Sequence, residues 1–269
     1  MRLFEFVPEG ESDCSVTAWI QTGIDIGLSK NDAYPAVIIC PGGGYQQVCP
    51  HEGEPIAKPY FAAGYHIFIL NYSVKEEAKN FRPLCQLAAT IAHIRKNAKI
   101  WNVAADKIAV CGFSAGGHLA ASAGTLFNEQ EFLAVYGRSE GIRPDAMILG
   151  YPVITADDFA HVSSIEHVSG AKAGSKEYEW FGLDKRVDKE TPPAFLWHTA
   201  ADTNVPVENS LYFARALSKA KIPFELHVFT EEEHGMASCT NEVGRLSVYN
   251  GRWIEWSIRW LNHIFQYQV

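Results

Sequence analysis

The stretch VCGFSAGGHLA, from Val110 to Ala120, places one serine among three glycines directly after an apolar run. Residues 107–112, KIAVCG, form a short continuous apolar segment of the kind found in buried strands. After Ser114, small and apolar residues such as Leu119 favour a helix. The sequence therefore predicts a strand that turns sharply into a helix at Ser114.

The pentapeptide Gly112–Gly116 fits the pattern G-x-S-x-G, in which a strained turn exposes a nucleophilic serine. The glycines have a steric reason, because side chains two residues before and after that serine would collide. A helix that starts at Ser114 also directs its N-terminal dipole at the reacting centre. The competing interpretation is a glycine-rich turn with an incidental serine, but the strand-to-helix context favours the nucleophile.

Strand and helix signals alternate along most of the chain. Apolar runs bounded by turn residues predict strands over 36–40, 66–72, 107–113, 146–151, 193–199 and 224–229. Apolar residues at helical spacing predict helices from Pro83, after Ser114, over about 207–217 and over 253–264. This order predicts the α/β class, with a mainly parallel, twisted sheet and helices on both faces.

We expect a single domain over residues 1–269, because no linker or internal repeat divides the chain. One long interruption, residues 154–191, is irregular, polar and partly aromatic. It is either a small cap over a site or surface decoration, and its length slightly favours the cap.

Composition and charge exclude several classes of protein. The hydrophobic content of 47% and charged content of 20% are those of an ordinary globular domain. The net charge of −8, without a basic cluster, argues against a nucleic-acid partner. No apolar segment approaches the roughly 18 residues of a membrane span, and the N-terminus lacks the apolar core of a signal peptide, so we expect a cytoplasmic protein without a membrane partner.

The six cysteines show no CxxC pair and no metal-ligand spacing. Cys40 and Cys111 fall within predicted buried strands, as core thiols do. We therefore expect no structural disulfide, no metal and no cofactor.

A nucleophilic serine needs a base, and the base needs an orienting carboxylate. Where a G-x-S-x-G turn carries such a triad, the chain order is Ser, then Asp or Glu, then His. Asp202 follows the predicted strand 193–199, and His234 follows the predicted strand 224–229. We therefore predict a triad of Ser114, Asp202 and His234.

Each partner has rivals in the sequence. Asp157 and Asp158 follow an earlier strand and rank below Asp202, while Glu208 falls inside a predicted helix. Among the histidines, His198 and His227 lie within predicted strands. His118 is one helical turn past the serine and is expected to pack under the turn.

Stabilising a developing oxyanion requires preorganised donors, usually backbone N–H groups. The segment PGGGY, residues 41–45, follows the predicted strand 36–40 and lets the backbone approach a substrate closely. A phosphate-binding loop is the competing idea, but the lysine and spacing of that motif are missing. We assign the oxyanion hole to the N–H groups of Gly43, Gly44 and Ala115.

Taken together, these residues resemble the α/β-hydrolase superfamily of esterases and lipases, from about residue 34 to the C-terminus. More narrowly, PGGGY, HEGEPIA, GFSAGGHLA and the loops of Asp202 and His234 look like the acetylxylan-esterase branch of the carbohydrate esterases. The resemblance implies an α/β-hydrolase fold and the removal of short acyl groups from sugars. In the related hormone-sensitive-lipase branch a histidine precedes the glycine triplet, whereas here Pro41 does.

The substrate is then a small ester, for which Tyr45, Gln46, His51 and Met236 are the predicted pocket residues. Tyr45 directly follows the glycines, so we expect its ring to border the acyl side and to favour short acyl groups. Tyr178 and Trp180 could stack on a sugar ring or serve as packing. Two alternatives stay open: a serine peptidase of the prolyl-oligopeptidase type, and a non-catalytic ligand-binding protein. The sequence leaves the oligomeric state open.

Overall fold

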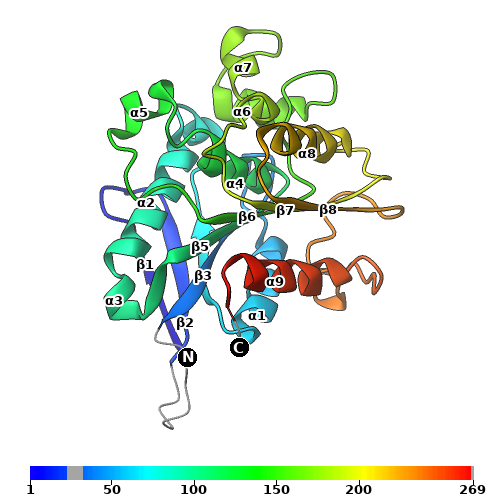
Figure 1. Ribbon diagram of the computed structural model, residues 1–269. Coiled ribbons are helices and arrows are strands. Elements are labelled where there is room, and N and C mark those ends of the chain that lie inside the picture. Colours follow the sequence, from blue (N-terminus) through cyan, green and yellow to red (C-terminus); the bar gives the residue numbers. More distant parts are fainter. Residues whose placement is uncertain (23–32, 268–269) are drawn as a thin grey trace.

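The computed structural model describes residues 1–22 and 33–267. Within them, eight strands form one sheet in the order β1-β2-β4-β3-β5-β6-β7-β8 (Figure 1). The strands are β1 Arg2–Phe6, β2 Ser15–Ile20, β3 Tyr34–Cys40, β4 His66–Asn71, β5 Val103–Phe113, β6 Ala146–Gly150, β7 Ala194–Thr199 and β8 Phe224–Phe229.

The sheet is parallel from β4 to β8, whereas β1 and β2 join it antiparallel at one edge. The predicted mainly parallel sheet is thus confirmed, and every predicted strand is present. The sequence analysis missed β1 and β2. The side chains of β2 alternate between half-buried and buried positions, and β1 is mostly exposed, so neither forms the continuous apolar run that marked the inner strands.

Helices cover both faces of the sheet, as expected (Figure 1). They are α1 Glu54–Ala62, α2 Arg82–Lys96, α3 Ala98–Trp101, α4 Ala115–Thr125, α5 Gln130–Tyr136, α6 Val162–Ser169, α7 Lys176–Trp180, α8 Glu208–Ala220 and α9 Arg252–Ile264, with short 3-10 turns η1 Pro50–Glu52, η2 Lys75–Ala78, η3 Leu183–Lys185 and η4 Asn241–Val243. Helices α2, α4 and α8 pack on one face, and α1 and α9 pack on the other.

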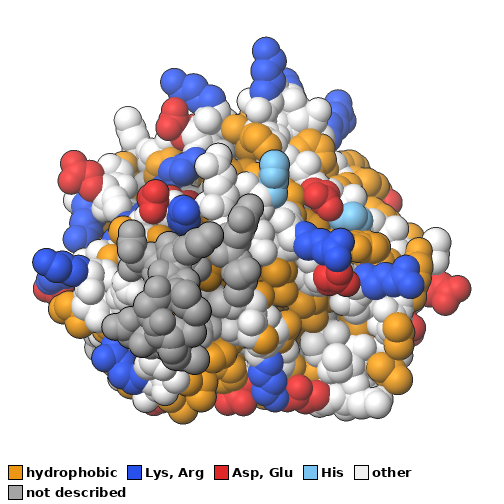
Figure 2. Space-filling view, turned by 60° about the horizontal axis from the view of Figure 1, so that its bottom comes forward, with side chains coloured by type: hydrophobic (Ala, Val, Ile, Leu, Met, Phe, Trp, Pro, Cys, Tyr) orange, Lys and Arg blue, Asp and Glu red, His pale blue; other side chains and the backbone are white. Residues whose placement is uncertain are grey.

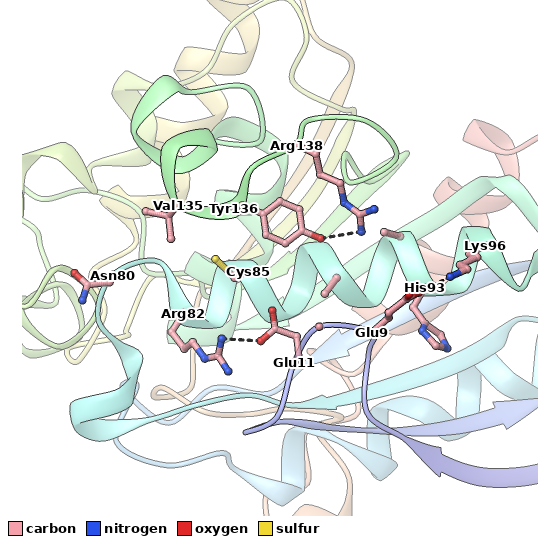
Figure 3. A pocket seen from close by; sticks show the side chains of 13 residues that line it. Glu9, Glu11, Asn80, Arg82, Cys85, His93, Lys96, Val135, Tyr136 and Arg138 are labelled. Atoms are coloured by element: carbon pink, nitrogen blue, oxygen red, sulfur yellow. Dashed lines mark hydrogen bonds and ion pairs between the residues drawn. The ribbon is translucent and has the colours of Figure 1, made fainter.

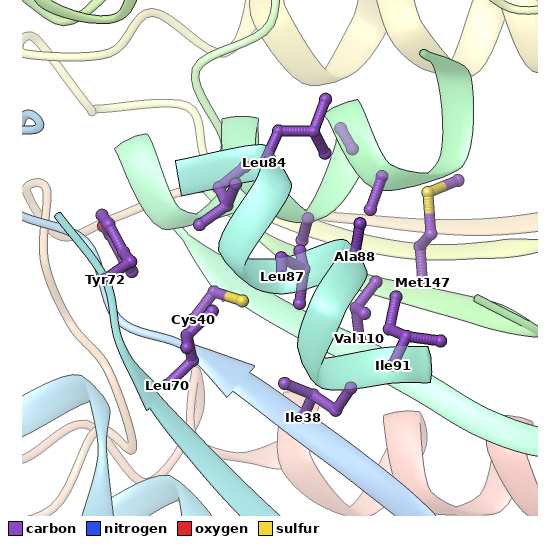
Figure 4. Close-up of a cluster of buried hydrophobic side chains, with 14 of the residues drawn as sticks. Ile38, Cys40, Leu70, Tyr72, Leu84, Leu87, Ala88, Ile91, Val110 and Met147 are labelled. Atoms are coloured by element: carbon purple, nitrogen blue, oxygen red, sulfur yellow. The ribbon is translucent and has the colours of Figure 1, made fainter. Parts of the chain in front are cut away.

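The core is double because the inner strands are apolar on both faces. In β3, Ile38 faces the α2 side, while Val37 and Ile39 face the α1 side. Figure 4 shows Leu87 and Ile91 of α2 lying over the sheet on the first of these faces. On the opposite face, Trp253 of α9 stacks on Trp197 of β7 with 4.9 Å between ring centroids. Two such layers hold the strand ends in fixed positions.

Residues 154–191 contain α6, α7 and η3, and they lie on the α4 and α8 side of the sheet (Figure 1). Tyr178 is 2% exposed, and Arg186 lies over the ring of the partly buried Trp180 at 4.4 Å. Both aromatic side chains are therefore part of the packing of this segment.

The surface carries charges of both signs, interspersed on the face that Figure 2 shows. None of the helices in the described ranges is both long enough and apolar enough to pass through a bilayer.

The turn between β5 and α4 is built from backbone segments in unusually close contact. A Cβ added to Gly112 would lie 2.1 Å from the carbonyl oxygen of Gly116. One added to Gly116 would lie 2.1 Å from the carbonyl oxygen of Cys40, at the end of β3. Only glycine therefore allows α4 to start against the ends of two neighbouring strands.

This crowding predicts unequal costs for two glycine substitutions in α4. Gly116→Ala should lower the free energy of unfolding by about 3 kcal/mol, because rigid backbone stands in the way. Gly124→Ala is the matched control, since its Cβ meets the flexible end of Met147. It should cost less than about 1 kcal/mol. Urea unfolding compares the two variants, and equal midpoints would contradict the assigned crowding.

Candidate active site

Three side chains from different loops form one chain of hydrogen bonds at the carboxyl edge of the sheet. Ser114 follows β5, Asp202 follows β7 and His234 follows β8. The Oγ of Ser114 lies 2.8 Å from Nε2 of His234. The Nδ1 of His234 lies 2.6 Å from Oδ2 of Asp202. With the proton on Nδ1, His234 donates to the carboxylate and accepts from the serine hydroxyl.

Ser114 occupies a strained conformation, with φ of 54° and ψ of −122°. A non-glycine residue adopts such angles only where its surroundings enforce them. Here the close-packed glycines on either side enforce them and turn Oγ toward His234. Ser114 also precedes the first residue of α4, so the positive end of that helix dipole lies beside Oγ.

Asp202 is 5% exposed and fully hydrogen-bonded. Its Oδ1 accepts from the N–H groups of Asn204 at 3.0 Å and Val205 at 2.8 Å. Burial raises the pKa of Asp202, but hydrogen bonds from His198 and His234 lower it by more, so the pKa lies well below its usual range. The carboxylate thus stays ionised beside the imidazole.

The rival carboxylates lie elsewhere. Asp157 is exposed and pairs with Lys185 at 2.8 Å, while Asp158 is exposed next to it. Glu208 begins α8, as the periodicity predicts. Of the four carboxylates weighed as the acid, Asp202 is the one that lies against His234. His118 is buried under the turn, with Nε2 3.0 Å from the Phe181 carbonyl oxygen.

Three backbone N–H groups beside Ser114 donate to no acceptor in the part of the chain that is described: those of Gly43, Gly44 and Ala115. Gly43 and Gly44 have φ of +127° and +66°, which side-chain-bearing residues rarely adopt. Ala115 opens α4, where an N–H has no partner within the helix.

The glycine loop is held at both of its ends. The N–H of Gly42 donates to Oε2 of Glu52 at 2.6 Å. The Nδ1 of His167, in α6, lies 3.1 Å from the carbonyl oxygen of Gly44. The free N–H groups therefore belong to a fixed segment, as preorganised donors require.

A cavity of about 410 Å³ opens over Ser114. Most of the side chains in its wall are polar, and the lining residues are Gly43, Gly44, Cys49, His51, Glu52, Ser114, His161, Asn204, His234, Gly235, Val243 and Arg245. Burial lowers the pKa of His161, and the neighbouring His234 lowers it further. A neutral His161 can both donate and accept hydrogen bonds.

Of the four predicted pocket residues, His51 lines this cavity and the other three do not. Tyr45 is 1% exposed, and its hydroxyl lies 2.9 Å from Nδ1 of His118. Its φ of +58° turns the ring into the core, so the prediction that it borders the acyl group is wrong. Met236 is 1% exposed in the α9-side core, and Gln46 is exposed beside His167.

Sequence analysis missed six side chains of the cavity wall: Cys49, Glu52, His161, Asn204, Val243 and Arg245. The signal for Asn204 was its place two residues after Asp202. His161 lies inside the segment that the sequence analysis treated as a cap or decoration. Glu52 was part of the quoted HEGEPIA motif, but nothing in the sequence said that this carboxylate would be buried.

A larger cavity, of about 800 Å³, lies between α2, α5 and the turn after β1 (Figure 3). Its charged side chains largely pair with one another: Arg82 with Glu11 at 2.9 Å, and Lys96 with Glu9. It holds no arrangement of nucleophile and base, so the cavity over Ser114 is the candidate active site.

The chain is similar in sequence to known enzymes. The chain is 37% identical over 214 residues to endo-1,4-beta-xylanase B of Butyrivibrio fibrisolvens, covering 77% of this chain and 33% of that protein. It is 28% identical over 215 residues to the acetylxylan esterase of Xylanibacter ruminicola, covering 77% of this chain and 42% of that protein. The match thus spans less than half the length of either relative.

Solved structures match over almost the whole chain. An acetyl ester-xyloside bifunctional hydrolase from Caldicellulosiruptor lactoaceticus is 33% identical, with a TM-score of 0.81, over 95% of this chain and 89% of that one. A carboxylesterase from Lactobacillus plantarum is 28% identical, with a TM-score of 0.87, over all of both chains. The protein is therefore an α/β-hydrolase of the esterase type that resembles acetylxylan esterases. The BD-FAE family matches residues 24–217, and the chain belongs to that family.

The lowered pKa of Asp202 predicts how stability depends on pH. Its contribution to stability is present above the pKa of an unfolded aspartate, about 3.9, and is lost as the pH falls toward the lower pKa of the folded protein. The difference in unfolding free energy between the wild type and Asp202→Asn should therefore shrink as the pH falls from 7 to 3.

Urea unfolding at several pH values measures this difference. Asp158→Asn, which removes an exposed carboxylate, is the control and should leave the midpoint at pH 7 near the wild-type value. A difference for Asp202→Asn that grows toward acid pH would show that the carboxylate is not stabilised as an anion.

Proposed function

We propose that this protein is a serine esterase that removes short acyl groups, above all acetyl, from xylan-derived sugars. The observation that carries the proposal is the hydrogen-bonded chain from Ser114 through His234 to Asp202. The names of the acetylxylan esterase and of the acetyl ester-xyloside hydrolase among its relatives support the substrate class.

In the first half-reaction, Nε2 of His234 takes the proton of the Ser114 hydroxyl while Oγ attacks the acyl carbon. The carbonyl oxygen becomes an oxyanion that accepts hydrogen bonds from the free N–H groups of Gly43, Gly44 and Ala115. Asp202 stabilises the imidazolium that forms. His234 then passes its proton to the departing sugar oxygen, which leaves an acyl-enzyme on Ser114.

In the second half-reaction, His234 takes a proton from a water molecule, and the resulting hydroxide attacks the acyl carbon. The same N–H groups stabilise the second oxyanion. The proton returns to Oγ of Ser114 as the carboxylic acid leaves, so the enzyme is regenerated without a cofactor.

The polar wall of the cavity suits a sugar as the leaving group. His161 and Asn204 stand beside His234, and His51 and Arg245 supply further donors. We also propose that residues 154–191 act as a small cap, since His161 reaches the cavity from this segment.

The same wall suits a short acyl group. A buried methylene contributes about 0.8 kcal/mol when it leaves water for an apolar surface. Val243 is the main aliphatic side chain in the described wall of the cavity, so a long chain gains little there. The preference for acetate thus rests on a polar cavity rather than on the ring of Tyr45.

The catalytic assignment predicts that Ser114→Ala loses nearly all hydrolysis of p-nitrophenyl acetate and of acetylated xylobiose. The residual rate should be about 10³–10⁴ times the rate of the uncatalysed reaction in water. Ser122→Ala is the matched control, because Ser122 is also buried and lies in the same helix. It should keep wild-type turnover. Circular dichroism checks that both variants fold.

Several outcomes would overturn the proposed function. A wild-type enzyme that cleaves aminoacyl anilides but not acetyl esters would be a peptidase, and one without any turnover would be a binding protein. A maximum of kcat/KM at p-nitrophenyl octanoate would exclude the preference for short acyl groups.

The sugar-binding role of the cavity wall gives a separate prediction. His161→Ala should raise the KM for acetylated xylobiose about tenfold, the loss of one hydrogen bond, and leave p-nitrophenyl acetate little affected. His263→Ala, an exposed position on α9, is the control. Equal effects on both substrates would place His161 outside the sugar site.

A further inference from the structure

Glu52 is a buried carboxylate with no Lys or Arg partner among the residues that the structure describes. It is 2% exposed, and Nε2 of His51 lies 3.9 Å from its Oε1. Removing a carboxylate from water is costly unless hydrogen bonds replace the lost hydration. A position that bears such a cost next to a nucleophile suggests a role beyond stability.

Two short hydrogen bonds replace that hydration. Oε2 accepts from the N–H of Gly42 at 2.6 Å, and Oε1 accepts from the hydroxyl of Tyr151 at 2.6 Å. Both distances are short for hydrogen bonds to a carboxyl oxygen. Glu52 thus holds two groups that come from different strand ends, β3 and β6.

The first of these groups, the N–H of Gly42, fixes the glycine loop. A Cβ on Gly42 would lie 2.8 Å from Oε2 of Glu52 and 2.9 Å from Cβ of Ser114, so this peptide stands directly between the carboxylate and the nucleophile. Because Glu52 takes the N–H of Gly42, the orientation of the next peptides, Gly43 and Gly44, is set relative to Oγ.

The second of these groups, the hydroxyl of Tyr151, fixes the loop that carries His234. Tyr151 has φ of +36°, and its oxygen accepts from the N–H of Ala237 at 2.9 Å. Its ring stands edge-on to the ring of His234, with 4.9 Å between centroids. Glu52 therefore reaches the base through one tyrosine.

We propose that Glu52 is a positioning residue that holds the glycine loop and the loop of His234 at fixed positions relative to Ser114. The inference rests on the proposed serine-esterase function. Glu52 takes no proton and touches no reacting atom. It acts by keeping donors and base at the geometry that the transition state needs, where a displacement of about 1 Å can cost 10²-fold in rate.

This role differs from simple stabilisation in what it changes. Displacement of these loops relative to Ser114 should lower kcat and weaken binding of a transition-state analogue, while KM stays within about threefold of the wild type. A methyl trifluoromethyl ketone is a suitable probe, because its adduct with Ser114 places an oxyanion in the proposed hole.

The test compares Glu52→Ala, Glu52→Gln and Tyr151→Phe. Glu52→Ala should lower kcat about 10²-fold. Glu52→Gln keeps one hydrogen-bond acceptor and the side-chain volume, so it should fold like the wild type. Its kcat should fall about tenfold, and the kcat of Tyr151→Phe should fall by a similar factor. In each variant the Ki of the ketone should rise by the factor by which kcat/KM falls.

Tyr60→Phe is the matched control, because it also removes a buried hydroxyl with a hydrogen bond, 2.5 Å from Oγ of Ser257. Tyr60 belongs to the same buried cluster as Tyr151 but does not line the cavity over Ser114. Tyr60→Phe should leave kcat and Ki unchanged. The outcome that overturns the proposal is a folded Glu52→Gln and Tyr151→Phe pair with wild-type kcat and Ki, in a wild-type enzyme that cleaves acetyl esters.

Failure of the underlying function looks different. If the wild type cleaves no ester, or Ser114→Ala cleaves as well as the wild type, the serine-esterase mechanism fails and the role of Glu52 falls with it. If Glu52→Ala does not fold, Glu52→Gln decides the question alone.

Discussion

The site depends on one constraint: three backbone segments approach one another more closely than any side chain would permit. The strand β5 ends against the first turn of α4, and that turn lies against the end of β3. Gly112 and Gly116 occupy the two contacts, where an added Cβ would fall 2.1 Å from a carbonyl oxygen. The strain at Ser114 follows from this packing, and so does the short distance between the nucleophile and the glycine loop.

Two buried carboxylates then organise the loops around Ser114, each with a different task. Asp202 binds the imidazole of His234 and is held by backbone N–H groups of its own loop. Glu52 binds Gly42 and Tyr151, which belong to two other loops. One carboxylate thus serves the charge on the base, and the other links the segments that carry donors and base. His234 lies between them, in contact with both networks.

Residues 154–191 also contact the candidate site. His161 brings an imidazole to the cavity wall, and His167 contacts the carbonyl of Gly44 from the same segment. The insertion therefore contacts the glycine loop and also contributes a side chain to the cavity wall. In a fold that hosts many chemistries, such additions at the carboxyl edge are where selectivity arises.

Sequence alone determined the inner strands and the order of the three residues of the proposed triad. Continuous apolar runs predict buried parallel strands because both faces of such a strand are covered, and loops after those strands meet at one edge. Ser114, Asp202 and His234 could therefore be found from their places after β5, β7 and β8. The glycine at 112 could be explained in advance, because its added Cβ would meet Gly116 within the same turn, whereas the contact of Gly116 with Cys40 arises from the packing of β3.

Tertiary structure decided what the local pattern does not encode. Tyr45, next to the glycine loop, has a positive φ and a ring buried in the core, and no neighbour in the sequence dictates that angle. The strands β1 and β2 owe their form to pairing at the sheet edge, so their mostly exposed or alternating side chains gave no clear signal. The burial of Glu52 depends on Tyr151, 99 residues away along the chain. From sequence alone a glutamate is expected to be exposed to solvent. Its burial requires hydrogen-bond donors from distant residues, because those bonds offset the loss of hydration.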